Sequence, residues 1–117
     1  MIRLRFAGNQ FAWSYVIYSV YNVIAEWREN VPYGNTHMSE YIGLIMGITK
    51  CLEMGISDFD VEGDSVRVLS QMLLKEKCTQ RNLIPLYENS WELVNQCSRI
   101  SFHLIEKDYN SYTHSLL

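Results

Sequence analysis

Two acidic residues at the ends of neighbouring predicted elements are the strongest candidates for chemistry in this chain. Glu40 lies near the start of a predicted helix, and Asp64 lies where a short apolar strand runs into the next helix. Carboxylate oxygens are the ligands that hard divalent cations such as Mg²⁺ prefer. This pair is therefore typical of a divalent-metal site, which would need further ligands from the rest of the chain.

The start of the chain is predicted to form an antiparallel meander of three strands. Residues 2–6 alternate between apolar side chains and arginine, which is the period of a half-buried strand. A turn at Gly8-Asn9 leads into a second strand over residues 13–17, and a third follows over residues 23–27. The aromatic residues of this meander are interpreted as core, in preference to a platform for stacking bases.

A long helix is predicted after the meander, and it carries the first acid. Asn35 or Thr36 can cap it, because a side-chain oxygen accepts a free N–H group of the first turn. Apolar residues recur at helical spacing from residue 38 to residue 52 and form one buried stripe. Gly43 and Gly47 lie on another face, where we expect them to permit close approach to a sheet.

Strands and helices alternate in the second half of the chain. Phe59 and Val61 predict a short buried strand, and the next helix follows the second acid. The buried side of that helix is expected at Val66, Leu69 and Leu73. The basic run Lys75–Arg81 is interpreted as a solvated loop. Pro85 fits the first turn of a third helix, where its missing N–H costs nothing. The buried candidates of that helix are Leu86, Leu93 and Val94.

A fifth strand over residues 100–104 and a short helix over residues 111–117 complete the predicted order βββαβααβα. Strands separated by helices run parallel, because a crossover returns the chain to the same end of the sheet. We therefore expect an α/β fold with a mixed five-stranded sheet and helices on both faces, in a single domain over residues 1–117. Ligands bind such sheets beyond the carboxyl ends of the parallel strands. Those ends are Phe6-Ala7, Gly63-Asp64 and residues 108–114, with Glu40 offered from the adjacent helix.

Composition and charge limit the functional classes. Hydrophobic residues make up 48% and charged residues 20%, as in a soluble globular protein, and no apolar run approaches the ~20 residues of a membrane span. The start is not a signal peptide, and three cysteines without a CxxC pair argue against a disulfide framework, so we expect an intracellular protein. A net charge of −3 argues against nucleic-acid binding by bulk electrostatics, although acids at a metal site contribute to that total.

A dense motif runs from Glu40 to Gln71. Its residues are Glu40, Tyr41, Leu44, Ile45, Gly47, Lys50, Leu52, Glu53, Gly55, Ile56, Val61, Glu62, Gly63, Asp64, Ser65 and Gln71. This motif resembles the ribonuclease H type 1 superfamily in its reverse-transcriptase-like branch. Pro85-Leu86-Tyr87 is similar to the start of the family's following helix, and Ile100–Asn110 to its final strand and the loop that ends in Asn. The resemblance covers nearly the whole chain and implies a ribonuclease H-like fold.

The chemistry that this resemblance implies is hydrolysis of the RNA strand of an RNA–DNA hybrid. Two divalent ions about 4 Å apart, Mg²⁺ or Mn²⁺, are held by four carboxylates in the family. Glu40 matches the second acid and Asp64 the third. The first would follow the opening strand in a pattern like LxFDG, but this chain has Ala7 there. The fourth would follow the terminal asparagine as NxxxD, and the corresponding position after Asn110 is His114.

Two of the four ligands that the resemblance implies are therefore replaced. We expect two-metal hydrolysis to be lost or severely weakened, and a divalent ion at Glu40 and Asp64 to bind weakly or not at all. Without a metal the two acids would repel, which raises one pKa. We interpret His114 as a solvated or capping histidine. The alternative is that one of its ring nitrogens binds Mn²⁺ or Zn²⁺.

The positions that the resemblance matches to substrate contacts differ from the family as well. The family's asparagine pair before the second acid reads Thr36-His37, and the glycine-rich turn is shortened. Contacts to 2′-hydroxyl groups allow a protein to distinguish RNA from DNA. We therefore expect these replacements to alter substrate binding as well. The matched positions are Gly8, Asn9, Thr36, His37, Ser65 and Asn110.

Three functional readings follow. In the first, the chain binds an RNA–DNA hybrid or RNA but has lost catalysis. In the second, it is a hybrid-cleaving endonuclease in which Ala7 is an engineered replacement of an aspartate. In the third, it is an interaction or scaffold module whose ligand is a protein partner or a larger assembly.

Overall fold

The computed structural model describes residues 1–32, 34–74 and 76–117, and it confirms the expected element order with one short 3-10 helix added. The strands are β1 (Ile2–Gly8), β2 (Ala12–Ser19), β3 (Asn22–Asn30), β4 (Asp58–Gly63) and β5 (Arg99–Leu104). The helices are α1 (Thr36–Glu53), α2 (Val66–Leu73), α3 (Ile84–Val94) and α4 (Ser111–Ser115), with the 3-10 helix η1 (Lys107–Asn110) before α4. Within the described ranges, no helix has the length and apolar character needed to cross a membrane.

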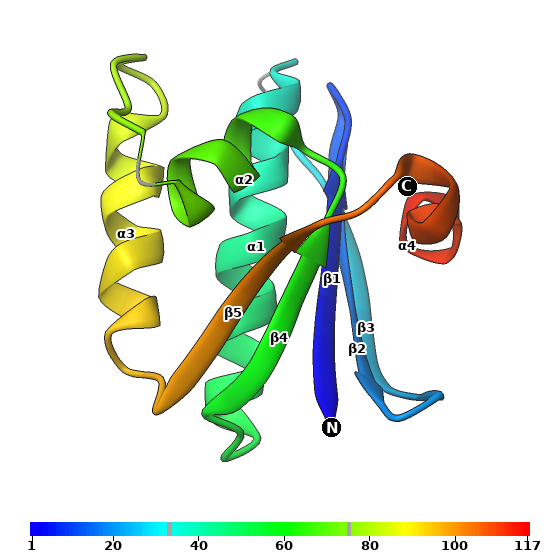
Figure 1. Ribbon diagram of the computed structural model, residues 1–117. Helices are drawn as coiled ribbons and strands as arrows, with labels where there is room; N and C mark the ends of the chain where they lie inside the picture. The colour runs from blue at the N-terminus through cyan, green and yellow to red at the C-terminus, as the bar shows by residue number, and fades with distance from the viewer. Residues whose placement is uncertain (33, 75) are drawn as a thin grey trace.

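The strands form one mixed five-stranded sheet in the order β3-β2-β1-β4-β5. The meander β1–β2–β3 is antiparallel, whereas β4 runs parallel to both of its neighbours, β1 and β5 (Figure 1). The parallel pairs arise because α1, and then α2 with α3, carry the chain back to the same end of the sheet. The carboxyl ends of β1, β4 and β5 therefore lie together, as the sequence predicts.

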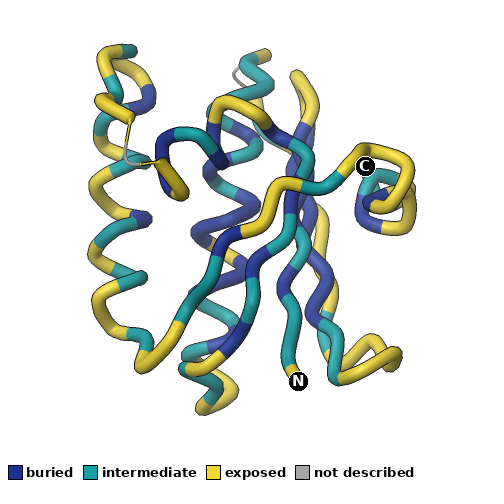
Figure 2. The backbone as a smooth tube through the Cα atoms, viewed as in Figure 1, coloured by how far each residue is buried: buried dark blue, intermediate teal, exposed yellow. Residues whose placement is uncertain are grey.

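Helices lie on both faces of the sheet, which confirms the expected architecture. Figure 1 shows α1, α2 and α3 on one face and α4 on the other. The core lies mainly between the sheet and α1, where the buried segments of Figure 2 concentrate. On the opposite face the hydroxyl of Ser14 in β2 donates a 2.7 Å hydrogen bond to the carbonyl of Thr113, which holds α4 against the sheet.

The side of α2 that faces the core differs from the prediction. Leu69 is buried as predicted, but Val66 and Leu73 are exposed, and Val68, Gln71 and Met72 are buried in their place. The amide of Gln71 is buried because it accepts a hydrogen bond from the hydroxyl of Tyr41 in α1. Because Gln71 is polar but buried, the apolar residues of this two-turn helix do not show the helical period on which the prediction depended.

The helix α3 is also less buried than predicted. Leu86, Leu93 and Val94 are only partly buried, and Ser90 is the one residue of α3 that is fully buried. The hydroxyl of Ser90 donates to the carbonyl of Leu86 one turn earlier, so its polar group is satisfied within the helix. The small side chain of Ser90 lets α3 pack closely against α1. The larger side chains of Leu86, Leu93 and Val94 are partly buried beside that contact.

The start of α1 is fixed by a cap and by a close contact with β1. The side chain of Asn35 accepts a 2.9 Å hydrogen bond from the amide of Met38, which confirms one of the two predicted caps. A Cβ atom on Gly8 would lie 2.5 Å from the backbone nitrogen of Glu40, a distance that no side chain could occupy. The expected close approach of Gly47 is also present, since a Cβ there would lie 2.5 Å from Leu4. The end of β1 and the start of α1 are therefore held in contact.

Candidate functional site

Asn110 joins the ends of β1 and β4. Its side-chain nitrogen donates a 3.0 Å hydrogen bond to the carbonyl of Phe6 and a 2.7 Å hydrogen bond to the carboxylate of Asp64. Asn110 is fully buried, so water does not compete for these hydrogen bonds. The end of η1 is thus tied to two strand ends, which confirms the convergence expected at this end of the sheet.

His114 contacts Asp64, and its interpretation as a solvated or capping residue is wrong. Its Nε2 atom lies 2.9 Å from one carboxylate oxygen of Asp64 and 3.1 Å from the other. Both side chains are mostly withdrawn from solvent, at 21% and 15% exposure. His114 follows the buried Asn110 by four residues, which is one helical turn, so both project toward the end of β4. The imidazole ring therefore covers the carboxylate that the resemblance assigns to a metal.

The environment of Asp64 favours its ionised form. Burial alone would raise the pKa of this carboxyl, but hydrogen bonds from His114 and Asn110 outweigh burial and hold the pKa below its usual range. Asp64 is therefore a carboxylate at neutral pH. Its negative charge is satisfied by neighbouring donors from the protein.

Glu40 has a different environment on the neighbouring helix. Its Oε1 atom lies 3.0 Å from Nδ1 of His37 in the previous turn of α1. Burial raises the pKa of Glu40, hydrogen bonds from His37 and Ser65 oppose that effect, and the net shift is upward. The charge of Asp64 adds to the upward shift, as expected, but it is a smaller cause than burial. Ser65 also caps α2 by accepting a hydrogen bond from the amide of Val68.

The residues present do not fit a two-metal centre. Ala7 lies buried at the end of β1, and its methyl group offers no ligand atom. At the fourth position His114 engages both oxygens of Asp64. Within residues 1–32, 34–74 and 76–117, no group of three or more histidine, cysteine, aspartate or glutamate side chains is arranged to hold a metal ion.

The positions matched to substrate contacts also have roles in holding the fold. Asn9 accepts 2.8 Å hydrogen bonds from the amides of Phe11 and Ala12, and so builds the turn between β1 and β2. Thr36 is the first residue of α1, and Gly8 packs against that helix. Contact of these residues with a nucleic acid stays a prediction.

A groove beside the start of α1 gathers basic side chains that the sequence did not connect. His37, Arg67 and Lys77 line a cavity of about 460 Å³ between α1, α2 and the chain that follows α2. The remaining lining residues are Val66, Ser70, Gln71, Glu76 and Gln80. Residues 76–81 form a mostly exposed loop, as predicted, and Glu76, Lys77 and Gln80 of this loop also line the groove; Lys75 lies outside the described residues.

Comparison with known proteins places the chain in a family. The model of the family described as "Reverse transcriptase-like" matches residues 21–117. The chain belongs to the reverse transcriptase-like family. A relative of this reverse transcriptase-like chain, the "Bifunctional protein Rv2228c" of Mycobacterium tuberculosis, is 29% identical over 94 residues, which are 80% of this chain and 26% of that protein. The "Uncharacterized protein Mb2253c" of Mycobacterium bovis matches to the same extent, so the chain spans about a quarter of the length of these relatives.

Solved structures show that this reverse transcriptase-like chain has the ribonuclease H fold. RNase H1 of the archaeon Halobacterium salinarum NRC-1 superposes with a TM-score of 0.91 at 20% identity, over 98% of this chain and 92% of that one. The N-terminal RNase H domain of Rv2228c gives 0.88 at 22%, over 99% and 91%. LC11-RNase H1, solved in complex with an RNA/DNA hybrid, gives 0.89 at 18%, over 99% and 93%. The resemblance inferred from the Glu40–Gln71 motif is confirmed.

Neutralising the two acids should change stability in opposite directions. Glu40→Gln removes a charge that burial disfavours, so the free energy of unfolding should rise at pH 7. Asp64→Asn removes a charged acceptor of hydrogen bonds from His114 and Asn110, so the free energy of unfolding should fall by roughly 1.5–3 kcal/mol. Urea denaturation of both variants measures the two signs.

The pH dependence of the two variants provides the control. The raised pKa of Glu40 makes its contribution most favourable below the unfolded pKa of about 4.3, and that contribution is lost as pH rises through the folded pKa. The lowered pKa of Asp64 makes its contribution present above about pH 3.9, and it is lost as pH falls through the folded pKa. Both differences from the unaltered chain should therefore vanish in acid. Effects of the same sign at pH 7 would contradict the assigned environments.

Proposed function

We propose that this chain is a nucleic-acid-binding domain with the ribonuclease H fold, that its ligand is an RNA–DNA hybrid or RNA, and that it does not cleave that ligand by two-metal chemistry. The pairing of His114 with Asp64 is the observation that carries the proposal. The end of β4 keeps its carboxylate, but a protein side chain satisfies it, and Ala7 at the end of β1 offers only a methyl group.

Loss of cleavage follows from what the reaction requires. Two-metal hydrolysis needs one ion to activate the attacking water and a second to stabilise the leaving oxygen. A cation approaching Asp64 must displace His114, and it gains no bridging ligand from position 7. Both features weaken the binding of divalent ions. We therefore expect the chain to bind its nucleic-acid ligand without hydrolysing it.

The groove between α1 and α2 supports a nucleic-acid ligand. His37, Arg67 and Lys77 line it beside Glu40, and Glu76 is the one acidic residue among its described lining. Basic side chains on such a surface neutralise phosphate charge, which supplies most of the sequence-independent affinity for nucleic acids. The net charge of −3 is compatible with this, because the basic groups are collected locally. LC11-RNase H1, which has the same fold, was solved with an RNA/DNA hybrid.

A labelled RNA–DNA hybrid tests binding directly. Fluorescence anisotropy at low salt, with EDTA present, should show saturable binding that weakens as salt rises, because binding releases counterions from the phosphates. Arg67→Ala and Lys77→Ala should each weaken binding and reduce the salt dependence. Arg99→Ala is the matched control, since Arg99 lies on β5 outside this groove and pairs with acids of β4. Absence of hybrid and RNA binding at low salt would favour a protein-interaction module.

A cleavage assay tests the impairment. The unaltered chain should release no product from the hybrid with Mg²⁺ or Mn²⁺, whereas Ala7→Asp combined with His114→Asp supplies both missing carboxylates and should restore Mn²⁺-dependent cleavage. Cleavage by the unaltered chain would contradict the proposal. Failure of the double variant to cleave a hybrid that it still binds would show that other changes cause the impairment.

The single variant Ala7→Asp tests the hypothesis that Ala7 is an engineered replacement in an otherwise active nuclease. If an engineered change at Ala7 alone had inactivated a nuclease, Ala7→Asp would suffice to restore cleavage. The contact of His114 with Asp64 leads us to expect that this variant stays inactive until His114 is also replaced.

A further inference from the structure

The outer side of β3 is an open strand edge. β3 ends the sheet order among the described strands, and it is nine residues long with almost every residue exposed. An open edge presents unpaired N–H and C=O groups that can pair with another strand, and proteins commonly block it with lysine, proline or a bulge. Residues 25–30 contain neither lysine nor proline and pair with β2 in continuous register. Trp27, at the middle of this edge, is 56% exposed.

We propose that β3 pairs antiparallel with β3 of a second copy of this chain, about a two-fold axis at Trp27. The sequence Glu26-Trp27-Arg28 is self-complementary in charge under that symmetry. When Trp27 lies opposite Trp27 of the second copy, each Glu26 lies opposite Arg28 of the other. Directly opposed residues of antiparallel strands project from the same face with their Cβ atoms about 5 Å apart. Because side chains alternate along a strand, the two Trp27 side chains would meet on one face of the joined sheet, and two Glu26–Arg28 ion pairs would form on the other.

Neighbouring registers lack this complementarity. A two-fold axis at Glu26 opposes two carboxylates, and an axis at Arg28 opposes two guanidinium groups. An axis midway between two residues is excluded, because it would oppose residues whose side chains project from opposite faces of the sheet. Because like charges directly opposed are destabilising, one register is selected.

The hydrogen-bond phase of the existing sheet agrees with this register. The amide of Val31 donates a 2.7 Å hydrogen bond to the carbonyl of Phe11, and bonded pairs alternate along an antiparallel ladder. Trp27 therefore directs its backbone groups toward Tyr15, its partner in β2. Glu26 and Arg28 direct theirs to the open edge. The two residues that match by charge are thus also the two that can exchange backbone hydrogen bonds with a second copy.

The side chains of Glu26 and Arg28 are held in position beside this edge. Glu26 accepts a 2.8 Å hydrogen bond from the hydroxyl of Tyr112, and Arg28 donates to the carbonyls of Leu116 and Leu117. Among the described residues, Oε2 of Glu26 and Nη1 of Arg28 have no partner, so each keeps an atom for the second copy. A cavity of about 270 Å³ is lined by Glu26, Trp27, Arg28 and Leu116, so open space borders the two charged side chains.

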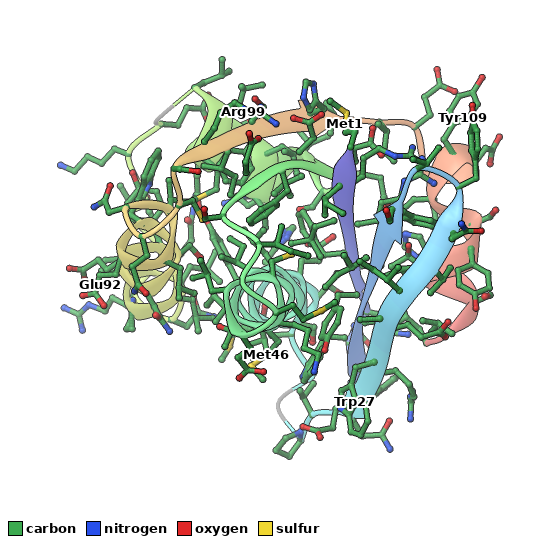
Figure 3. The ribbon with its side chains drawn as sticks, turned by 90° about the horizontal axis from the view of Figure 1, so that it is seen from below. Met1, Trp27, Met46, Glu92, Arg99 and Tyr109 are labelled. Atoms are coloured by element: carbon green, nitrogen blue, oxygen red, sulfur yellow. The ribbon has the colours of Figure 1, made fainter. Side chains whose placement is uncertain are left out.

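Charge exchange tests the proposal, with molecular mass as the readout. Light scattering after gel filtration should give twice 13.7 kDa at high concentration for the unaltered chain. Glu26→Arg and Arg28→Glu oppose like charges and should each stay monomeric, whereas an equimolar mixture of the two should form a heterodimer. The double variant E26R/R28E should dimerise with itself. Glu92→Arg is the control for charge, because α3 lies on the opposite side of the molecule from β3 (Figure 3).

A cysteine pair tests the register. Trp27→Cys should form a disulfide-linked dimer on mild oxidation, because directly opposed residues without mutual backbone hydrogen bonds lie about 4.5 Å apart at Cα. Val23→Cys should not, since Val23 lies opposite Val31 in this register. Both variants keep Cys51, Cys78 and Cys97, so the difference between them reports the added cysteine. A monomeric unaltered chain at every concentration, no association of the mixed charge variants, or equal cross-linking of both cysteine variants would overturn the proposal.

Discussion

The side chain of Asn110 holds the candidate site together. Its amide nitrogen binds the end of β1 through the carbonyl of Phe6 and the end of β4 through Asp64. Because Asn110 is fully buried, replacing it would leave these groups without a solvent substitute. The same contact fixes the start of α4, which carries His114 to Asp64 one turn later. The positions of Asp64 and His114 therefore both depend on the neutral side chain of Asn110.

The consequence is an acidic site whose charge is satisfied from within the protein. In the metal-dependent chemistry that the family resemblance implies, carboxylates gathered at these strand ends are neutralised by divalent ions. Here Asp64 is paired with His114, Glu40 is paired with His37 and has a raised pKa, and Ala7 contributes no charge. The fold is that of ribonuclease H, and this internal pairing of the acids supports our proposal that the chain binds its ligand without hydrolysing it.

Much of the fold was predictable from the sequence, because strand and helix periods, the Asn35 cap and parallel crossovers are local or topological signals. The inner side of α2 was not, since the buried Gln71 depends on a hydrogen bond from Tyr41 thirty residues earlier. The contact between His114 and Asp64 joins residues fifty positions apart, so spacing could show only that an acid was replaced. Arg67 was missed because its neighbours in the groove come from separate segments.

His114 satisfies the carboxylate of Asp64, and we propose that Asp64 is therefore a poor metal ligand. Isothermal titration calorimetry of the unaltered chain with Mn²⁺ tests that claim most directly, because it reports the number and affinity of bound ions without requiring a substrate. We predict at most one weak site, held by Glu40 and Asp64. Two tight sites would contradict the account.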